Sequence, residues 1–251
     1  MSSADVAGAQ AGGSDGIRGA FAAEAARLAE VMLALPEADF ARPTGCAPWT
    51  VAELLAHVRT ATGRLLDMLA RPAPDRAEVD AAGYYGPSKF AAATDAARIT
   101  GARREAATVP SGHALAEDFD RVWLAVRAAV VGQRGDRVVV TRHGDPMALD
   151  EFLRTRVVEL GVHGLDLAAA LDRAPWLTPA AAAVIERLLL GDAAAADAAP
   201  AGPARVDVAA PYADLGWDRL TFIAKATGRS PIDPGERAAV DRLGLRWLSF
   251  G

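Results

Sequence analysis

The sequence is poor in cysteine, with Cys46 as its only one. A single cysteine excludes an intramolecular disulfide framework and is typical of a protein from a reducing compartment. Cys46 lies between glycine and proline in residues 44–48, and its sequence neighbours include no base or cation that would activate a thiol. We therefore interpret Cys46 as a passive loop residue, with a reactive thiol as the less favoured alternative.

Long apolar runs and basic clusters are also missing. No stretch reaches the roughly 18 uncharged apolar residues that span a bilayer. Residues 1–16, rich in Ala, Gly and Ser, lack the basic start and unbroken apolar core of a secretion signal, and we interpret them as a disordered lead. The net charge of −5 argues against a dedicated nucleic-acid surface. These absences predict a cytoplasmic protein with neither a nucleic-acid nor a membrane partner.

Helical periodicity dominates what is present. Hydrophobic residues make up 51% of the 251 residues, which is enough for a sizeable core, and they recur at the spacing of one helix face in five long segments. The predicted long helices cover residues 17–35, 50–70, 115–130, 149–172 and 178–190. A short helix is expected near 88–105 and a short strand at 137–141, followed by a turn at 143–146.

The chain divides into four parts by composition. After the lead, residues 17–190 are predicted to form one helix bundle. Residues 191–203 are low-complexity Ala, Asp, Gly and Pro, and we interpret them as a linker. Residues 204–251 form a short C-terminal extension with two expected helices, at 217–229 and 234–243. This extension is too small for a robust core of its own unless it docks on the bundle.

Three residues that commonly bind metal ions are directed toward one core. Glu159 and His163 stand four apart on the apolar side of one predicted helix, and His57 lies on the apolar side of another. Residues four apart on a helix differ by roughly 40° in direction and about 6 Å in height, so both can bind one ion. Burying an unpaired carboxylate costs several kcal/mol, so Glu159 must bind metal, pair with a cation or face solvent. Metal uses all three residues, whereas hydrogen-bonded, partly buried histidines are the ordinary alternative.

The surrounding motifs resemble those of a known family. Residues 48–58, Pro-Trp-Thr-Val-Ala-Glu-Leu-Leu-Ala-His-Val, resemble the Trp-Thr-x-x-(Asp/Glu)-Leu-x-x-His signature of the DinB-like, mycothiol-dependent maleylpyruvate isomerase family. Residues 156–167 resemble the second metal motif of that family. The resemblance covers roughly the first 175 residues. It implies a mainly α fold built on a DinB-like four-helix bundle, with His57, Glu159 and His163 as ligands of a divalent metal.

The resemblance also implies an enzyme that uses a low-molecular-weight thiol such as mycothiol in isomerisation, conjugation or S-transfer. Longer members carry a sterol-carrier-like domain that contributes a cationic side chain, whereas this sequence keeps only the short extension, possibly as a reduced remnant. That difference weakens the expectation of isomerase activity. Arg229 is the candidate cation, with a solvated surface residue as the alternative. Asp166, three residues after His163, is the candidate acceptor that orients this histidine, or else a surface carboxylate.

Two histidines and one carboxylate leave coordination positions open, as in catalytic metal sites. We expect zinc, with nickel, iron and manganese left open. The expected chemistry is that the ion lowers the pKa of an external thiol, and that the thiolate adds to a small electrophilic substrate. A metal-dependent hydrolase or lyase that uses bound water, and a non-catalytic ligand-binding bundle, are the alternatives. Tyr84 and Tyr85 are candidates for a pocket wall or for an ordinary core pair.

Overall fold

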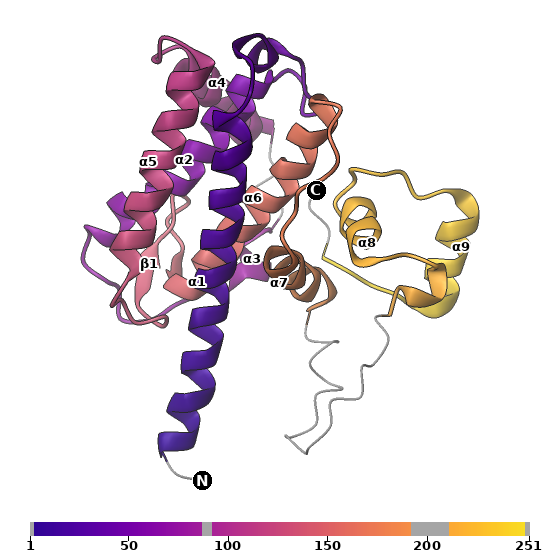
Figure 1. Ribbon diagram of the computed structural model, residues 1–251. Helices are drawn as coiled ribbons and strands as arrows, with labels where there is room; N and C mark the ends of the chain where they lie inside the picture. Colours follow the sequence, from indigo (N-terminus) through magenta and orange to yellow (C-terminus); the bar gives the residue numbers. More distant parts are fainter. Residues whose placement is uncertain (1–2, 87–91, 192–210, 249–251) are drawn as a thin grey trace.

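Four long helices form the centre of the molecule (Figure 1). The computed structural model describes residues 3–86, 92–191 and 211–248. The bundle helices are α1 (Ser3–Leu33), α2 (Val51–Leu69), α5 (Gly112–Val130) and α6 (Leu149–Ala170). Helices α1 and α2 each pack against both α5 and α6. The predicted mainly α fold with a four-helix bundle is therefore confirmed.

Helix α1 starts much earlier than the sequence analysis predicted. Residues 3–16, interpreted there as part of a disordered lead, continue the same helix backwards from its first described buried residue, Ile17. Apolar periodicity, the signal that predicts a helix with a buried face, is weak before Ile17. Alanine has the highest intrinsic helix propensity, so an Ala-rich segment extends an existing helix without needing a buried face.

Further helices surround the bundle. Helix α4 (Ala92–Ala106) packs on α2, and α7 (Pro179–Leu190) packs against α1 and α6. Three short elements were not predicted, because each is too short to show a helical period: η1 (Glu37–Ala41), α3 (Ala81–Tyr84) and η4 (Ala213–Leu215). Helix α3 contacts α6, and it brings the long connection between α2 and α5 onto the helix that carries Glu159 and His163.

A two-stranded antiparallel hairpin joins α5 to α6. Its strands are β1 (Val138–Val140) and β2 (Pro146–Ala148), and Val139 lies opposite Met147. The first strand and the turn are as predicted, whereas β2 was not predicted. Three residues that begin with proline carry little strand signal, since proline cannot donate to the ladder and is confined to edges.

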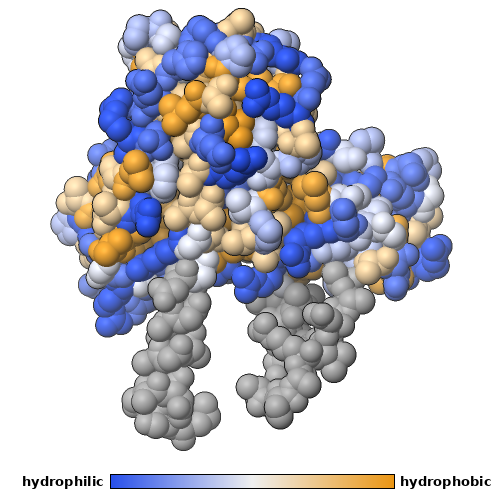
Figure 2. Space-filling view, in the orientation of Figure 1, coloured by the Kyte–Doolittle hydropathy of each residue, from blue (hydrophilic) through white to orange (hydrophobic). Residues whose placement is uncertain are grey.

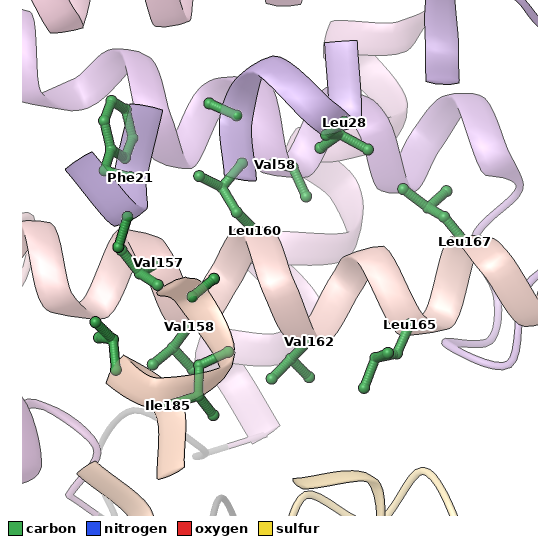
Figure 3. Close-up of a cluster of buried hydrophobic side chains, with 14 of the residues drawn as sticks. Phe21, Leu28, Val58, Val157, Val158, Leu160, Val162, Leu165, Leu167 and Ile185 are labelled. Atoms are coloured by element: carbon green, nitrogen blue, oxygen red, sulfur yellow. The ribbon is translucent and has the colours of Figure 1, made fainter. Parts of the chain in front are cut away.

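Helix α6 is buried on more sides than an amphipathic helix would be. Figure 3 shows Val158 and Val162 on the side of α6 nearest Ile185 of α7, whereas Leu160 lies on the side toward α1 and α2. The approach of α7 is close: a Cβ atom added at Gly161 would lie 2.6 Å from Ile185 Cδ1. Tight packing on both sides fixes the rotation of α6 and therefore the direction of its polar side chains.

The predicted starts of α2 and α7 are confirmed by their caps. Thr50 accepts a hydrogen bond from the Glu53 N–H while the Glu53 side chain accepts from the Thr50 N–H, which is the expected capping box of α2. Thr178 caps α7, and Pro179 occupies its first turn. The sequence therefore fixes the start of the helix that carries His57.

The C-terminal extension docks on the bundle through α7. It contains α8 (Arg219–Ala226) and α9 (Pro234–Leu243), both as predicted, and α8 packs on α7. Glu186 of α7 pairs with Arg219 at 2.7 Å and accepts a hydrogen bond from Tyr212. Residues 192–203 of the predicted linker lie outside the described residues. The division of the chain into a bundle, a linker and an extension stays a prediction.

Hydrophilic residues cover much of the face shown in Figure 2 and divide its hydrophobic area into separate patches. The large hydrophobic side chains that are exposed come from different helices and loops, namely Leu33, Leu124, Val131 and Leu243. Among the described residues, none of the helices combines the length and the apolar character that crossing a membrane requires.

Candidate metal site

The three residues expected to bind metal lie together between α2 and α6. Glu159 Oε2 is 3.4 Å from His57 Nε2 and 3.5 Å from His163 Nε2. The two imidazole rings are 5.2 Å apart and nearly perpendicular, at 87°. One donor atom from each residue lies within 4.8 Å of the other two. The three residues that the helical spacing predicted to lie together do lie together. Their role as metal ligands stays a prediction.

The donor set fits a divalent ion. Two imidazole nitrogens and a carboxylate oxygen facing one another are the ligands that zinc accepts in catalytic sites. The side chains of His57, Glu159 and His163 are 12 to 15% exposed, so the cluster is sheltered but still reached from solvent. Three ligands with remaining access leave room for a small molecule at the site.

The two histidines differ in their electrostatic surroundings. Burial lowers the pKa of His57 to about 4, and the opposing effect of Glu159 does not compensate. Burial acts in the same direction on His163, but hydrogen bonding to Asp166, Cys46 and Glu159 outweighs it and raises the pKa of His163 well above its usual value. The Trp49 ring, from the same motif as His57, stacks on that imidazole at 4.8 Å and 26°.

Asp166 and Arg229 join the site from two different parts of the chain. Asp166 Oδ2 lies 2.9 Å from His163 Nδ1, and Arg229 donates to both carboxylate oxygens of Asp166 at 3.0 Å each. Burial opposes ionisation, yet His163 and Arg229 hold the pKa of Asp166 well below its usual range. The Arg229 side chain is 27% exposed, so it is not the solvated surface residue of the alternative interpretation. The short extension thus reaches His163 through Asp166.

Cys46 lies closer to the site than the sequence analysis anticipated. Its sulfur lies within 4.8 Å of a His163 ring nitrogen and an Asp166 carboxylate oxygen, which also lie within 4.8 Å of each other. The loop folds back because the Thr44 N–H donates to the Trp49 carbonyl and the Trp49 N–H donates to the Cys46 carbonyl. Only the nearness of Cys46 to the first motif pointed to this position, since its neighbours in space come from α6.

Arg156 is a buried cation beside Glu159. Its Nη2 is 3.7 Å from Glu159 Oε1, while its Nη1 donates to the Ala61 carbonyl at 3.2 Å. The guanidinium also lies over the Phe152 ring, 4.7 Å from the centroid, and the residue is 3% exposed. The two Glu159 oxygens therefore face different partners, Arg156 on one side and the two histidines on the other. This contact also offsets part of the cost of burying the carboxylate.

Tyr84 and Tyr85 form a core pair. Each is 7% exposed, and their rings meet edge to face at 5.5 Å. The Tyr85 hydroxyl donates to the Thr155 carbonyl at 3.2 Å, and burial together with the Glu159 charge raises the pKa of Tyr85 well above its usual value. These tyrosines support the helix beneath Glu159, which is the ordinary one of the two roles considered for them.

The arrangement of these motifs agrees with a comparison of the sequence with protein families. The model of the mycothiol maleylpyruvate isomerase N-terminal domain matches residues 21–168. The chain belongs to this family. The matched range contains His57, Glu159, His163 and Asp166, and it leaves out Arg229 and the rest of the extension.

Two solved structures are also similar to the chain. One is the mycothiol-dependent maleylpyruvate isomerase, at 14% identity and a TM-score of 0.47, with 74% of this chain and 73% of that chain covered. The other is a histidine-to-alanine variant of the mycothiol-dependent maleylpyruvate isomerase, at 13% identity and a TM-score of 0.49, with 69% and 68% covered. No curated protein matches the sequence.

Proposed function

We propose that this protein is an enzyme that uses a divalent metal and a low-molecular-weight thiol of the mycothiol type. The reaction class is thiol transfer or conjugation to a small electrophilic substrate, or thiol-assisted isomerisation of it. The observation that carries the proposal is the convergence of His57, Glu159 and His163 within 4.8 Å, in a chain whose family is named after a mycothiol enzyme.

The ligands would be His57 Nε2, His163 Nε2 and one oxygen of Glu159. A bound divalent ion, with zinc the best match to these donors, supplies a Lewis acid that lowers the pKa of a thiol. The remaining contacts orient the ligands. Trp49 fixes the His57 ring by stacking. Asp166 accepts a hydrogen bond from His163 Nδ1, so Nε2 is the nitrogen that faces Glu159, and its proton would be released when an ion binds there.

Arg229 supports the catalytic form of the proposal over an inert bundle. The guanidinium comes from the extension, 63 residues further along the chain, and contacts the carboxylate that is hydrogen-bonded to His163. The pairing of Arg229 with Asp166 keeps that carboxylate ionised, so Asp166 stays an acceptor for His163 at neutral pH. In this proposal Arg229 is the cationic side chain that the short extension contributes to the site.

The test is the thiol and metal dependence of turnover. Purified protein loaded with zinc is mixed with mycothiol and a panel of small electrophiles, and the free thiol and the products are followed over time. We expect turnover only with both zinc and thiol, and we expect His57→Ala to abolish it. His113→Ala is the matched control, because His113 is an exposed histidine paired with Glu37.

The fate of the thiol separates the reaction types. Thiol consumed in step with the substrate indicates transfer or conjugation, whereas thiol that remains constant during turnover indicates thiol-assisted isomerisation. Turnover at full rate without any thiol would reject the proposal and favour a hydrolase or lyase that uses water.

A further inference from the structure

A second feature of the molecule adjoins the proposed metal site. A cavity of about 240 Å³ lies between α2 and α4, and His57 forms part of its wall. We propose that this cavity binds an oxyanion group, a carboxylate or a phosphate, of the electrophilic substrate. That the bound group belongs to a substrate rests on the proposed function. The wall includes Thr60, Arg64, Arg98, Glu105 and Arg142.

The cavity gathers arginines from three elements. Arg64 comes from α2, Arg98 from α4, and Arg142 from the turn that follows β1. Arg64 is partly buried, and no hydrogen bond or ion pair to the described residues is formed by its guanidinium. Burial lowers the pKa of Arg64, and the like charges of Arg142 and Arg156 lower it further. Positive charge is thus concentrated here at a cost in stability, which an anion would offset.

The carboxylate in the wall does not neutralise this charge. Glu105 lines the cavity, but it is tied to Arg59 at 3.1 Å. Arg98 pairs with Asp95 at 2.6 Å, and Arg142 Nε donates to His143, so these two arginines are held in position by their neighbours. With Glu105 paired to Arg59 and Arg98 paired to Asp95, the unbalanced positive charge of the wall includes Arg64 and Arg142.

Thr60, which lines the cavity, carries a hydroxyl without a partner among the described residues. Thr60 Oγ1 is buried and makes no hydrogen bond within the described part of the chain. Arginine presents parallel N–H groups that match a carboxylate or a phosphate, and a threonine hydroxyl adds one more donor. A neutral occupant would leave these donors unpaired and the cations desolvated. The volume is below that of a typical pocket for a whole ligand, so the cavity holds one charged group of a larger substrate.

The position of the cavity next to His57 gives a bound oxyanion group a function. His57 faces Glu159 on one side and forms the cavity wall on the other. An oxyanion held by the arginines would place the adjoining carbon atoms of the substrate next to the metal ligands. The arginines would therefore select anionic electrophiles and set their orientation, while Arg229 approaches from the opposite end through Asp166.

Binding can be measured without thiol or turnover. Succinate, inorganic phosphate and neutral succinamide are titrated by calorimetry into the purified protein as isolated. We expect the two anions to bind, more weakly at high salt, and succinamide not to bind. Arg64→Gln is expected to weaken anion binding at least tenfold, which is about 1.4 kcal/mol. Arg127→Gln, an exposed arginine on α5, is the matched control and should bind as the wild type does.

Arg64→Lys is the second variant, for the case in which Arg64→Gln folds poorly. It keeps the positive charge but loses the paired N–H groups of the guanidinium, so it should bind the anions with intermediate affinity. A preference for succinate or for phosphate identifies the oxyanion. Equal binding of succinamide, or wild-type affinity in both Arg64 variants, would overturn the proposal. Loss of anion binding in Glu159→Gln with full retention in Arg64→Gln would place the anion on the metal ligands instead. Because no thiol is present, this outcome is independent of whether the proposed thiol chemistry holds.

Discussion

Breaking the contact between Arg229 and Asp166 is expected to destabilise the protein and to loosen the extension from the bundle. Asp166 is 7% exposed and accepts two hydrogen bonds of 3.0 Å from the guanidinium. Removing one member of a buried pair typically costs about 3 to 5 kcal/mol, because the other charge is left buried. Since the Arg229 side chain is 27% exposed, solvent screening reduces the expected cost to about 2 to 3 kcal/mol.

A double-mutant cycle isolates the pair. Arg229→Gln also loses a hydrogen bond of 2.6 Å to the Thr227 carbonyl, and the cycle with Asp166→Asn and the double variant subtracts that loss. We expect a coupling free energy of about 2 kcal/mol at pH 7, from urea unfolding followed by circular dichroism. A coupling below about 0.5 kcal/mol, the usual limit of additivity, would mean that the extension does not depend on this contact.

The pH dependence of the coupling gives an independent check. The pKa of Asp166 in the folded protein lies below the value of 3.8 expected for a free carboxyl, so the folded state binds its proton more weakly. The stabilisation is therefore fully present above about pH 4 and is lost as the pH falls further. The coupling should stay constant from pH 7 to pH 5. A coupling that disappears within this range would contradict the assigned charge state.

Two further predictions concern residues near the site and in the core. Cys46→Ser is expected to keep most of the thiol-dependent turnover, because the nucleophile is supplied from outside; an inactive variant, with a wild type that works without added thiol, would place the nucleophile on Cys46. Burial raises the pKa of Glu24, whose Oε1 lacks a partner while Oε2 accepts from the Thr178 N–H. The folded state favours the protonated carboxyl, and this contribution to stability is lost as the pH rises through the folded pKa. Glutamine is neutral at every pH, so Glu24→Gln should raise the melting temperature more at pH 8 than at pH 5. An equal change at both pH values would show that the Glu24 carboxyl does not titrate in this range.

Local signals predicted most of the helices and placed the proposed ligands close together. The capping box at Thr50 fixed the start of α2, and the helical period from there placed His57 inward. The four-residue spacing of Glu159 and His163 placed both on the side of α6 that faces α2. These features depend on neighbours in sequence, and short-range sterics and hydrogen bonding determine them.

The contacts that complete the site depend on distant residues. Cys46 meets His163 because a loop before α2 folds back over α6, and no local pattern carries that information. Arg156 was part of a motif, yet its role beside Glu159 required knowledge of how α2 and α3 pack on α6. The arginine cavity was missed for the same reason, since its wall combines residues of α2, α4 and the hairpin turn.

The most direct test of the account is the metal content of the Glu159→Ala variant. Chelator-treated wild type is titrated with zinc, and the bound metal is measured by elemental analysis with circular dichroism on the same samples. We predict one zinc per chain in the wild type and in the control Glu117→Ala, an exposed glutamate on α5. Glu159→Ala should retain little metal while staying as helical, because Arg156 loses its carboxylate partner but keeps its hydrogen bond to the Ala61 carbonyl, and α6 stays packed on α1 and α7. Full zinc occupancy in Glu159→Ala would contradict the proposed site.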